Sequence, residues 1–326
     1  MVIVLEEEEL TRLWGKLSVE AEGGSERALR SISESGAIYA SWNIREQTNE
    51  LIVKLDREWQ ESSTPNWRGM YFSIEDISTP SPSKHLVMGL QDKELGEVFS
   101  VFCIDALATI DGAPPGHLTE TLLAFIKGWD AFFQRTGNLP LSPEKQRGLY
   151  AELWWLRRLI ESGVPSLEAV TWWMGPERAY HDFESDRGVV EVKSTIRKEP
   201  RKVVINNERQ LDDSDIDELH LFVLTLNIHK EGESLPGIIE DIRERMEQAP
   251  LARQRLRRKL TLARYLDSDA AKYDSRYKPR SEELFKVGEG FPRITKLDPG
   301  VGDLKYSIQI SSCKDYEHGI DEFLGV

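Results

Sequence analysis

The segment 188–195 constrains the fold of this chain more than any other. Its sequence, Gly-Val-Val-Glu-Val-Lys-Ser-Thr, is rich in β-branched residues and predicts a strand. Because side chains alternate between the two faces of a strand, Glu191 and Lys193 would share one face and Val190 and Val192 the other. A carboxylate and an ammonium on so apolar a strand are costly to bury unless they pair or take part in chemistry. The alternative is an edge strand with one face in solvent.

A second carboxylate precedes this strand. His181-Asp182-Phe183 lies nine residues upstream, at the end of a short strand predicted over 179–183, and the residues 184–188 between them read as a turn. The two strands could pair as a hairpin, which would bring Asp182 towards Glu191. Two carboxylates and a lysine at a strand end can hold a hard divalent cation. Mg²⁺ prefers oxygen ligands and leaves positions for water and phosphate.

A third carboxylate is predicted on the helix before this hairpin. Ser142 is a suitable cap and Pro143 suits the first helical position, so the helix should run to about Glu161. Glu152 falls within the apolar face of this helix and should point towards the sheet, whereas a solvated glutamate belongs on the opposite side. The alternative is a glutamate at the margin of the stripe, paired to an arginine. The stripe consists of Leu149, Leu153, Leu156 and Ile160.

The order of elements predicts an α/β fold, α+β overall, in two domains. A chain of 326 residues is long enough for two domains, and 137–140 reads as the boundary. The first domain, 1–140, is strand-rich and has no catalytic motif; the second is 141–326. In the first domain we expect strands over 37–44, 51–55, 70–74, 86–89 and 98–110, and a helix over 118–134. In the second, besides the helix and strands above, we expect strands over 167–174, 203–205 and 219–227, and helices over 236–248 and 251–266.

Together these residues resemble the PD-(D/E)xK nuclease superfamily. Asp182 would take the motif aspartate, Glu191 the (D/E) and Lys193 the lysine, and Glu152 matches the acidic residue that many members carry on the preceding helix. His181 stands where the superfamily name has proline, a position that varies widely. Within the superfamily the pattern looks closest to the DUF4420 family. The matching segments are Trp173-Met174-Gly175-Pro176, Asp182-Phe183, Glu191-Val192-Lys193 and Gln210-Leu211.

The resemblance implies a restriction-endonuclease-like core, a mixed central sheet flanked by helices. It also implies Mg²⁺-dependent hydrolysis of DNA phosphodiester bonds, in bacterial restriction or phage defence, with Mn²⁺ as a substitute metal. Asp182 and Glu191 would bind the metal with the Val192 carbonyl, and Glu152 would bind it directly or through water. Lys193 would hold the attacking water or the phosphate. Gln210 would have a positioning role at the rim, or would simply be a polar residue at a helix start.

Charge argues at first against nucleic acid, because the net charge is −14 and phosphate binding needs positive charge. The charge is segregated, however: residues 251–280 carry +7, 191–203 carry +3 and 205–250 carry −8. We therefore expect a phosphate-binding surface, with three arginines on one helical face and Tyr265, Tyr273 and Tyr277 nearby. The alternative is a basic helix that pairs with the acidic segment before it. The expected DNA-binding residues are Arg197, Lys198, Arg201, Lys202, Arg253, Arg257 and Arg264.

A second hypothesis is a non-catalytic subunit that keeps the nuclease fold. It would assemble with an ATPase or helicase or with a methyltransferase, using the first domain for docking. A homodimer is a further alternative. A metal-dependent phosphatase has less support, since no further acidic or histidine cluster is visible. Two cysteines, Cys103 and Cys313, fit a reducing compartment, and no targeting or membrane segment is evident. The cytoplasm is therefore the expected location.

Overall fold

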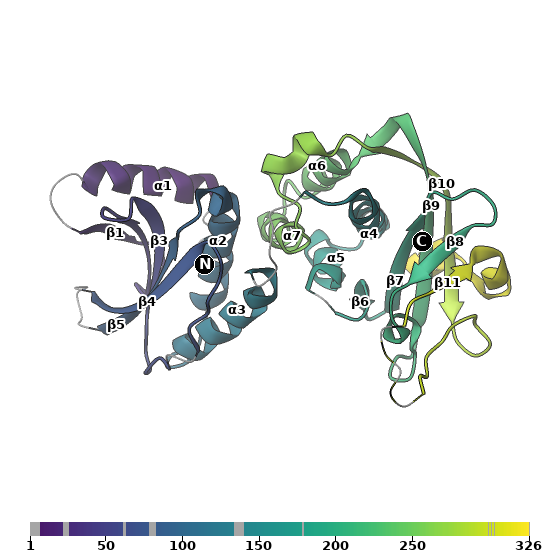
Figure 1. The fold of residues 1–326 in the computed structure, drawn as a ribbon, viewed down its shortest axis with the longest axis horizontal. Coiled ribbons are helices and arrows are strands. Elements are labelled where there is room, and N and C mark those ends of the chain that lie inside the picture. The colour runs from purple at the N-terminus through teal and green to yellow at the C-terminus, as the bar shows by residue number, and fades with distance from the viewer. Residues whose placement is uncertain are drawn as a thin grey trace. The chain divides into compact units, whose positions relative to one another are not determined.

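The chain forms two compact units, Met1–Leu139 and Pro140–Val326 (Figure 1). The boundary predicted after residue 140 lies one residue from this division, although residues 137–139 are outside the described part of the chain. The computed structural model describes residues 7–21, 26–60, 63–77, 83–133, 140–177, 179–298, 300, 302 and 304–325.

The first unit is built on an antiparallel sheet with the strand order β1-β2-β3-β5-β4. The α1 helix contacts β2 and α2, and α2 contacts α3. The strands are β1 (Arg27–Ser31), β2 (Ile38–Asn43), β3 (Thr48–Lys54), β4 (Met70–Ile77) and β5 (Ser83–Leu90). The helices are α1 (Glu7–Glu20), α2 (Gly96–Ile110) and α3 (Leu118–Phe133), with a 3₁₀ turn η3 (Lys93–Leu95).

The strand predicted over 98–110 is wrong, because this segment is the helix α2. Ten of its fifteen residues are buried, so it is apolar on most sides and lacks the one-sided pattern of a surface helix. A continuous apolar run of this kind does not distinguish a buried helix from a buried strand. The helix predicted over 118–134 is confirmed as α3, and residue 134 lies outside the described residues.

The second unit is built on a mixed sheet with the strand order β12-β10-β9-β7-β6, in which β7 and β9 are parallel and the other pairs antiparallel. A separate two-stranded sheet pairs β8 with β11. The strands are β6 (Phe183–Ser185), β7 (Gly188–Thr195), β8 (Lys202–Ile205), β9 (Leu219–Ser234), β10 (Arg276–Val287), β11 (Tyr306–Gln309) and β12 (Glu317–His318). The helices are α4 (Pro143–Glu161), α5 (Ser166–Trp172), α6 (Leu235–Arg245), α7 (Pro250–Leu262) and α8 (Ile320–Leu324). The 3₁₀ turns are η4 (Gly175–Glu177), η5 (Glu208–Leu211), η6 (Asp267–Lys272) and η7 (Ile310–Tyr316).

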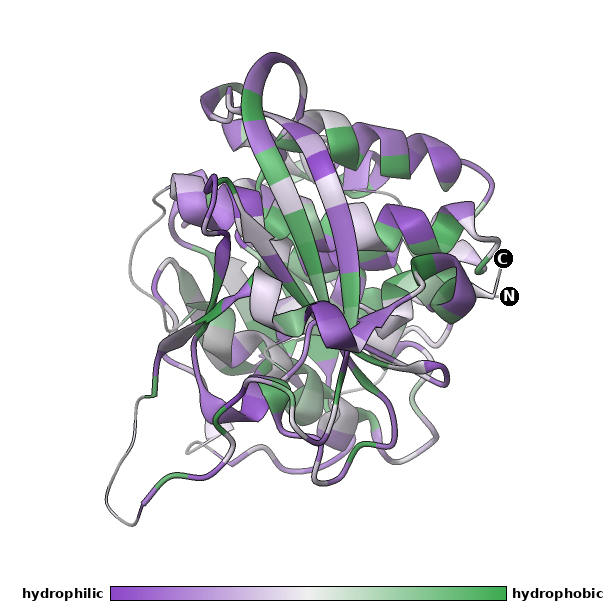
Figure 2. Cartoon of the chain, turned by 90° about the vertical axis from the view of Figure 1, so that its right-hand side faces the viewer, coloured by the Kyte–Doolittle hydropathy of each residue, from purple (hydrophilic) through white to green (hydrophobic). Residues whose placement is uncertain are grey.

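The mixed sheet has an apolar core on each face. On one face Val190 and Val192 join the buried cluster that contains the apolar side chains of α4. On the other face Leu221 and Val223 pack with the small sheet, for example with Ile308. In Figure 2 one of the long strands at the front is largely green, that is, apolar, and the strand beside it is mainly purple and white. The predicted alternation along β7 is therefore confirmed.

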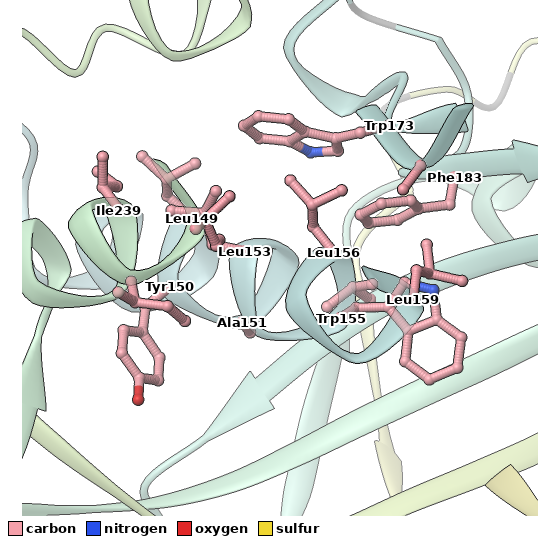
Figure 3. Packing of buried hydrophobic residues seen from close by; sticks show 14 of the residues in the cluster. Leu149, Tyr150, Ala151, Leu153, Trp155, Leu156, Leu159, Trp173, Phe183 and Ile239 are labelled. Atoms are coloured by element: carbon pink, nitrogen blue, oxygen red, sulfur yellow. The ribbon is translucent and has the colours of Figure 1, made fainter. Parts of the chain in front are cut away.

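The α4 helix begins as predicted. Ser142 Oγ accepts a hydrogen bond of 3.4 Å from the Lys145 N–H and Pro143 occupies the first turn. Leu156 of α4 packs in one cluster with Trp173 and Phe183 (Figure 3). This packing fixes α4 against the segment that follows α5 and against the start of β6.

Several predicted elements of the second unit differ in the structure. The strand expected over 167–174 is the short helix α5. The strand expected over 179–183 begins only at its last residue, as β6. The helix expected over 251–266 ends at Leu262. Across the described residues of both units, none of the helices combines the length and the apolar character needed to cross a bilayer.

Candidate active site

The hairpin of β6 and β7 places Asp182 next to Glu191. Phe183 pairs with Val190 in an antiparallel register, so Asp182 lies directly before β6 at the open end of the hairpin. Its Oδ2 accepts a hydrogen bond of 2.8 Å from the Val192 N–H. The hairpin predicted from the sequence is therefore confirmed.

Glu191 and Lys193 form a buried ion pair on β7. The Lys193 ammonium donates to Glu191 Oε1. Glu191 is 0% exposed, and its other oxygen, Oε2, has no hydrogen-bond partner in the part of the chain that the structure describes. Because the side chains of Lys193 and Glu191 are only 13% and 1% exposed, the alternative of a strand with this face in solvent does not apply.

The side chain of Glu152, on α4, lies close to that of Asp182. Its Oε2 accepts a hydrogen bond of 2.8 Å from Trp173 Nε1. Gly175 lies beside both Glu152 and Asp182. A Cβ atom added to this glycine would be 2.8 Å from Glu152 Oε2 and 2.9 Å from Asp182 Oδ1. The two carboxylates therefore face one small space, which Gly175 keeps open because it has no side chain.

Burial is the main cause that raises the pKa of all three carboxyl groups. It raises the pKa of Glu191 well above its usual range, and the Asp182 charge adds to this. Burial and then repulsion from Asp182 raise the pKa of Glu152 to about 8. The pKa of Asp182 is also raised, since burial outweighs the opposing charge of Lys193. Burial alone would lower the pKa of Lys193, but the carboxylates around it raise that pKa overall. One ammonium thus does not balance three carboxylates, which favours a further cation or a proton.

Trp173 and Gly175 belong to this site, although no role was predicted for them. Both lie in the Trp-x-Gly-Pro segment, which was the available signal. The pattern of apolar residues could not predict these roles, because Trp173 and Gly175 both act through contact with Glu152, which lies more than twenty residues earlier in the chain.

Gln210 lies in η5 and makes local hydrogen bonds. Its Oε1 accepts from the Asn206 N–H at 2.8 Å, and its own N–H donates to Asn207 Oδ1 at 3.1 Å. These contacts match the alternative of a polar residue at a helix start. A positioning role for Gln210 at the rim of the site stays a prediction.

The basic residues that follow β7 differ in their surroundings. Arg197 and Lys198 are exposed, and Lys202 is half-buried on β8. Arg201 binds both carboxylate oxygens of Glu283 on β10, at 2.5 and 3.0 Å. Arg201 thus has a partner within the protein, whereas Arg197 and Lys198 extend from the surface next to the strand of the site.

Of the three arginines predicted to share one face of a helix, Arg253 and Arg257 lie four residues apart on α7, but Arg264 does not lie on this helix. Because α7 ends at Leu262, Arg264 lies beyond it, with a left-handed φ of 67°. Arg253 is exposed on α7, whereas Arg257 donates to the carboxylate of Asp267.

The three tyrosines expected beside those arginines are core residues. Tyr265, Tyr273 and Tyr277 are 1%, 2% and 2% exposed, in the cluster that contains the apolar face of α4. The prediction that they line a phosphate-binding surface is therefore wrong.

A divalent cation suits the donors at this site. The three carboxylates offer hard oxygen ligands, the buried Glu191 Oε2 has no partner among the described residues, and Gly175 leaves room between two carboxylates. Within the described ranges, however, no three His, Cys, Asp or Glu side chains are already arranged to hold one ion. Ligation by all three carboxylates would therefore require side chains to move from the positions seen here.

Comparison with known proteins agrees with this arrangement. A family model described as "Putative PD-(D/E)XK family member, (DUF4420)" matches residues 10–311, most of the chain. No curated protein and no solved structure matches the chain. The family match spans both units and includes every residue of the cluster. The chain therefore belongs to the DUF4420 family, a family assigned to the PD-(D/E)XK nuclease-like proteins.

Proposed function

We propose that this protein is a Mg²⁺-dependent DNA endonuclease of the bacterial cytoplasm, with a role in restriction or phage defence. The observation that carries the proposal is the convergence of Glu152, Asp182 and Glu191 with Lys193 on α4 and the β6–β7 hairpin. Membership of a nuclease-like family supports the reaction class.

Asp182, Glu191 and Glu152 would hold the metal, together with the Val192 carbonyl. When bound, Mg²⁺ (or Mn²⁺) supplies a water of lowered pKa and neutralises charge that develops on the scissile phosphate. The protein preorganises two of these ligands: Val192 N–H holds the Asp182 carboxylate and the Trp173 indole holds that of Glu152. Fixed ligands cost less to order when the metal arrives.

Lys193 is the cation of the site that would face the reacting groups. Its ammonium has three donors, one of which is directed to Glu191 Oε1. The remaining donors could hold an attacking water or a non-bridging phosphate oxygen, and so stabilise negative charge in the transition state. Burial strengthens this effect because solvent screens the interaction less.

DNA would be held by exposed basic residues near the site. Arg197 and Lys198 are exposed and closely follow β7, and the half-buried Lys202 on β8 and the exposed Arg253 on α7 are further candidates. Such contacts give affinity without sequence information. The acidic net charge of −14 makes this affinity weak and sensitive to salt, so a second copy or a partner subunit would assist binding.

The test is cleavage of plasmid DNA by the purified protein in Mg²⁺, in Mn²⁺ and in a chelator. We expect metal-dependent nicking or linearisation that is lost in Asp182→Ala and in Lys193→Ala. Arg12→Ala, at an exposed position on α1, is the matched control that passes through the same purification. Unchanged cleavage in both site variants would refute the assignment of the site.

A second candidate is a non-catalytic subunit of a defence complex that contains an ATPase, a helicase or a methyltransferase. The observation that favours it is that basic side chains such as Arg201 and Arg257 bind carboxylates of the protein itself. DNA that stays intact with every metal and partner, together with a stable complex in size-exclusion chromatography, would support this candidate over the nuclease.

A further inference from the structure

Lys259 is a buried lysine on a helix that is otherwise strongly basic. It lies on α7 and is 2% exposed. A buried ammonium is costly unless its donors are satisfied. Lys259 Nζ donates to the backbone carbonyls of Thr171, at 3.2 Å, and of Trp173, and Glu177 Oε2 lies 3.5 Å away. Lys259 therefore binds groups within the protein and is not available to bind DNA at the surface.

The two carbonyls that Lys259 binds lie at the end of α5. The last carbonyls of a helix have no partner within the helix, and a cation there satisfies them and complements the helix dipole. In this position Lys259 holds the point at which the chain leaves α5. The next residues are the segment 173–177, which contains Trp173 and Gly175.

Segment 173–177 makes direct contacts with two carboxylate residues of the site. The indole of Trp173 donates to Glu152 Oε2 at 2.8 Å. The backbone N–H groups of Met174 and Gly175 donate to the Asp182 carbonyl at 2.7 and 3.1 Å, and the Cα of Gly175 faces the carboxylates of both acids. A shift of this segment would therefore displace both Glu152 and Asp182.

Two arginines of α7 bind the same region of the chain. Arg255 donates to Thr171 Oγ1, and Arg258 donates to the Glu177 carboxylate. With Lys259 these residues form an i, i+3, i+4 set, so they lie on one side of the helix. This side of α7 packs against α5 and η4, at the back of the site.

We propose that Lys259 is a positioning residue for the carboxylate cluster. By holding the carbonyls of Thr171 and Trp173, it sets the position of the Trp173 indole and of Gly175, and thereby the positions of Glu152 and Asp182. The expected effect on metal binding rests on the proposed metal site, but the contact between Lys259 and Trp173 can be tested without metal. A purely structural lysine would join α7 to α5 and have no effect at the carboxylates.

The experiment compares Lys259→Met, which keeps side-chain length but has no donors, with Lys259→Arg, which keeps charge and donors. Lys278→Met, the same substitution at an exposed position on β10, is the control. Three quantities are measured on the full chain: the ¹⁵N–¹H resonance of the Trp173 indole (assigned with Trp173→Phe), the Kd for Mn²⁺, and the urea midpoint of unfolding.

We expect Lys259→Met to move the Trp173 indole resonance and to weaken Mn²⁺ binding by about 10- to 100-fold, the usual effect of losing a residue that supports metal ligands. Lys259→Arg should recover part of both, and Lys278→Met should change neither. A lower urea midpoint with an unmoved indole resonance and an unchanged Kd would overturn the proposal. If Lys259→Met does not fold, Lys259→Gln, which is shorter and uncharged, takes its place: it should also move the indole resonance and weaken Mn²⁺ binding, and an unmoved resonance with an unchanged Kd would overturn the proposal.

The two proposals fail separately. If the wild-type protein binds no Mn²⁺, the proposed metal-dependent function fails, while a moved indole resonance in Lys259→Met still supports positioning of Trp173. If the wild type binds Mn²⁺ and Lys259→Met binds it equally well, the positioning role fails and the metal site stands.

Discussion

Gly175 is the residue whose lack of a side chain matters most for the cluster. The methyl group of Gly175→Ala would approach Glu152 Oε2 and Asp182 Oδ1 to 2.8 and 2.9 Å, so both carboxylates would have to move. We expect the variant to stay folded and its Mn²⁺ affinity, measured by isothermal titration calorimetry, to fall by about tenfold or more.

The matched control is Gly148→Ala on α4, where the added Cβ would meet no described atom within 4 Å beyond its chain neighbours and the backbone of its own helix. Alanine in a helix should stabilise the protein by about 0.5–1 kcal/mol and leave Mn²⁺ affinity unchanged. Equal affinity of Gly175→Ala and the wild type would show that the space beside Gly175 is not part of the metal site.

His220 on β9 gives the fold a predictable dependence on pH. It is 1% exposed, and neither ring nitrogen has a hydrogen-bond partner in the described structure. Burial, with a contribution from the charge of His318, lowers the pKa of His220 to about 4. The folded state therefore binds this proton more weakly than the unfolded state, whose pKa is about 6.5. Its contribution to stability is complete above about pH 6.5 and is lost as the pH falls towards 4.

Between about pH 7 and pH 5 this group should reduce the free energy of unfolding by about 2 kcal/mol. Urea unfolding of the wild type and of His220→Leu at both pH values measures the effect as the difference between the two slopes with pH. Parallel slopes for the two proteins would mean that His220 does not titrate as its burial predicts.

At the scale of elements, two arginines on α7 should have different roles: one should contact DNA phosphate, and the other should stabilise the fold through an ion pair within the protein. Arg253 is exposed, whereas Arg257 is paired with Asp267 and its side chain is 18% exposed. We expect Arg253→Ala to reduce the slope of log K for DNA against log salt by about 1 without a loss of stability. Arg257→Ala should instead lower the free energy of unfolding by about 1 kcal/mol. Fluorescence anisotropy at several salt concentrations and urea unfolding give the two values, and the reverse pattern would contradict this division.

The elements with a clear period or cap were predictable from the sequence. The Ser142 cap, the apolar stripe of α4 and the alternation along β7 each determine a local structure, and all three were found. The hairpin followed from the turn between the strands, and so did the approach of Asp182 to Glu191. These features depend on residues near one another in the chain, which is why one sequence was sufficient.

Elements whose identity depends on distant contacts were not predictable. The buried helix α2 and the short helix α5 both read as strands, since tertiary packing decided their form. The same limit applies to Lys259, which contributes to the charge of +7 counted over residues 251–280 and is in fact buried against α5. Charge counts report composition along the chain, but they do not report which cations are already paired.

At the scale of the whole molecule, the residues proposed for catalysis all belong to the second unit. That unit has its own sheet and a buried core on each sheet face. We therefore expect residues 140–326 expressed alone to fold cooperatively and to bind Mn²⁺ with an affinity similar to that of the full chain. Calorimetric unfolding and Mn²⁺ titration of the fragment test this. An unfolded fragment, or a folded one without Mn²⁺ affinity, would show that the site needs the first unit.

The central claim is that Glu152, Asp182 and Glu191 together hold a divalent cation. The most direct measurement is an anomalous difference map from a crystal of the wild-type protein grown with Mn²⁺. The account predicts one manganese peak in contact with carboxylate oxygens of Asp182 and Glu191, with Glu152 bound directly or through water. A map in which Lys193 still pairs with Glu191 and no manganese peak lies among the three carboxylates would contradict it.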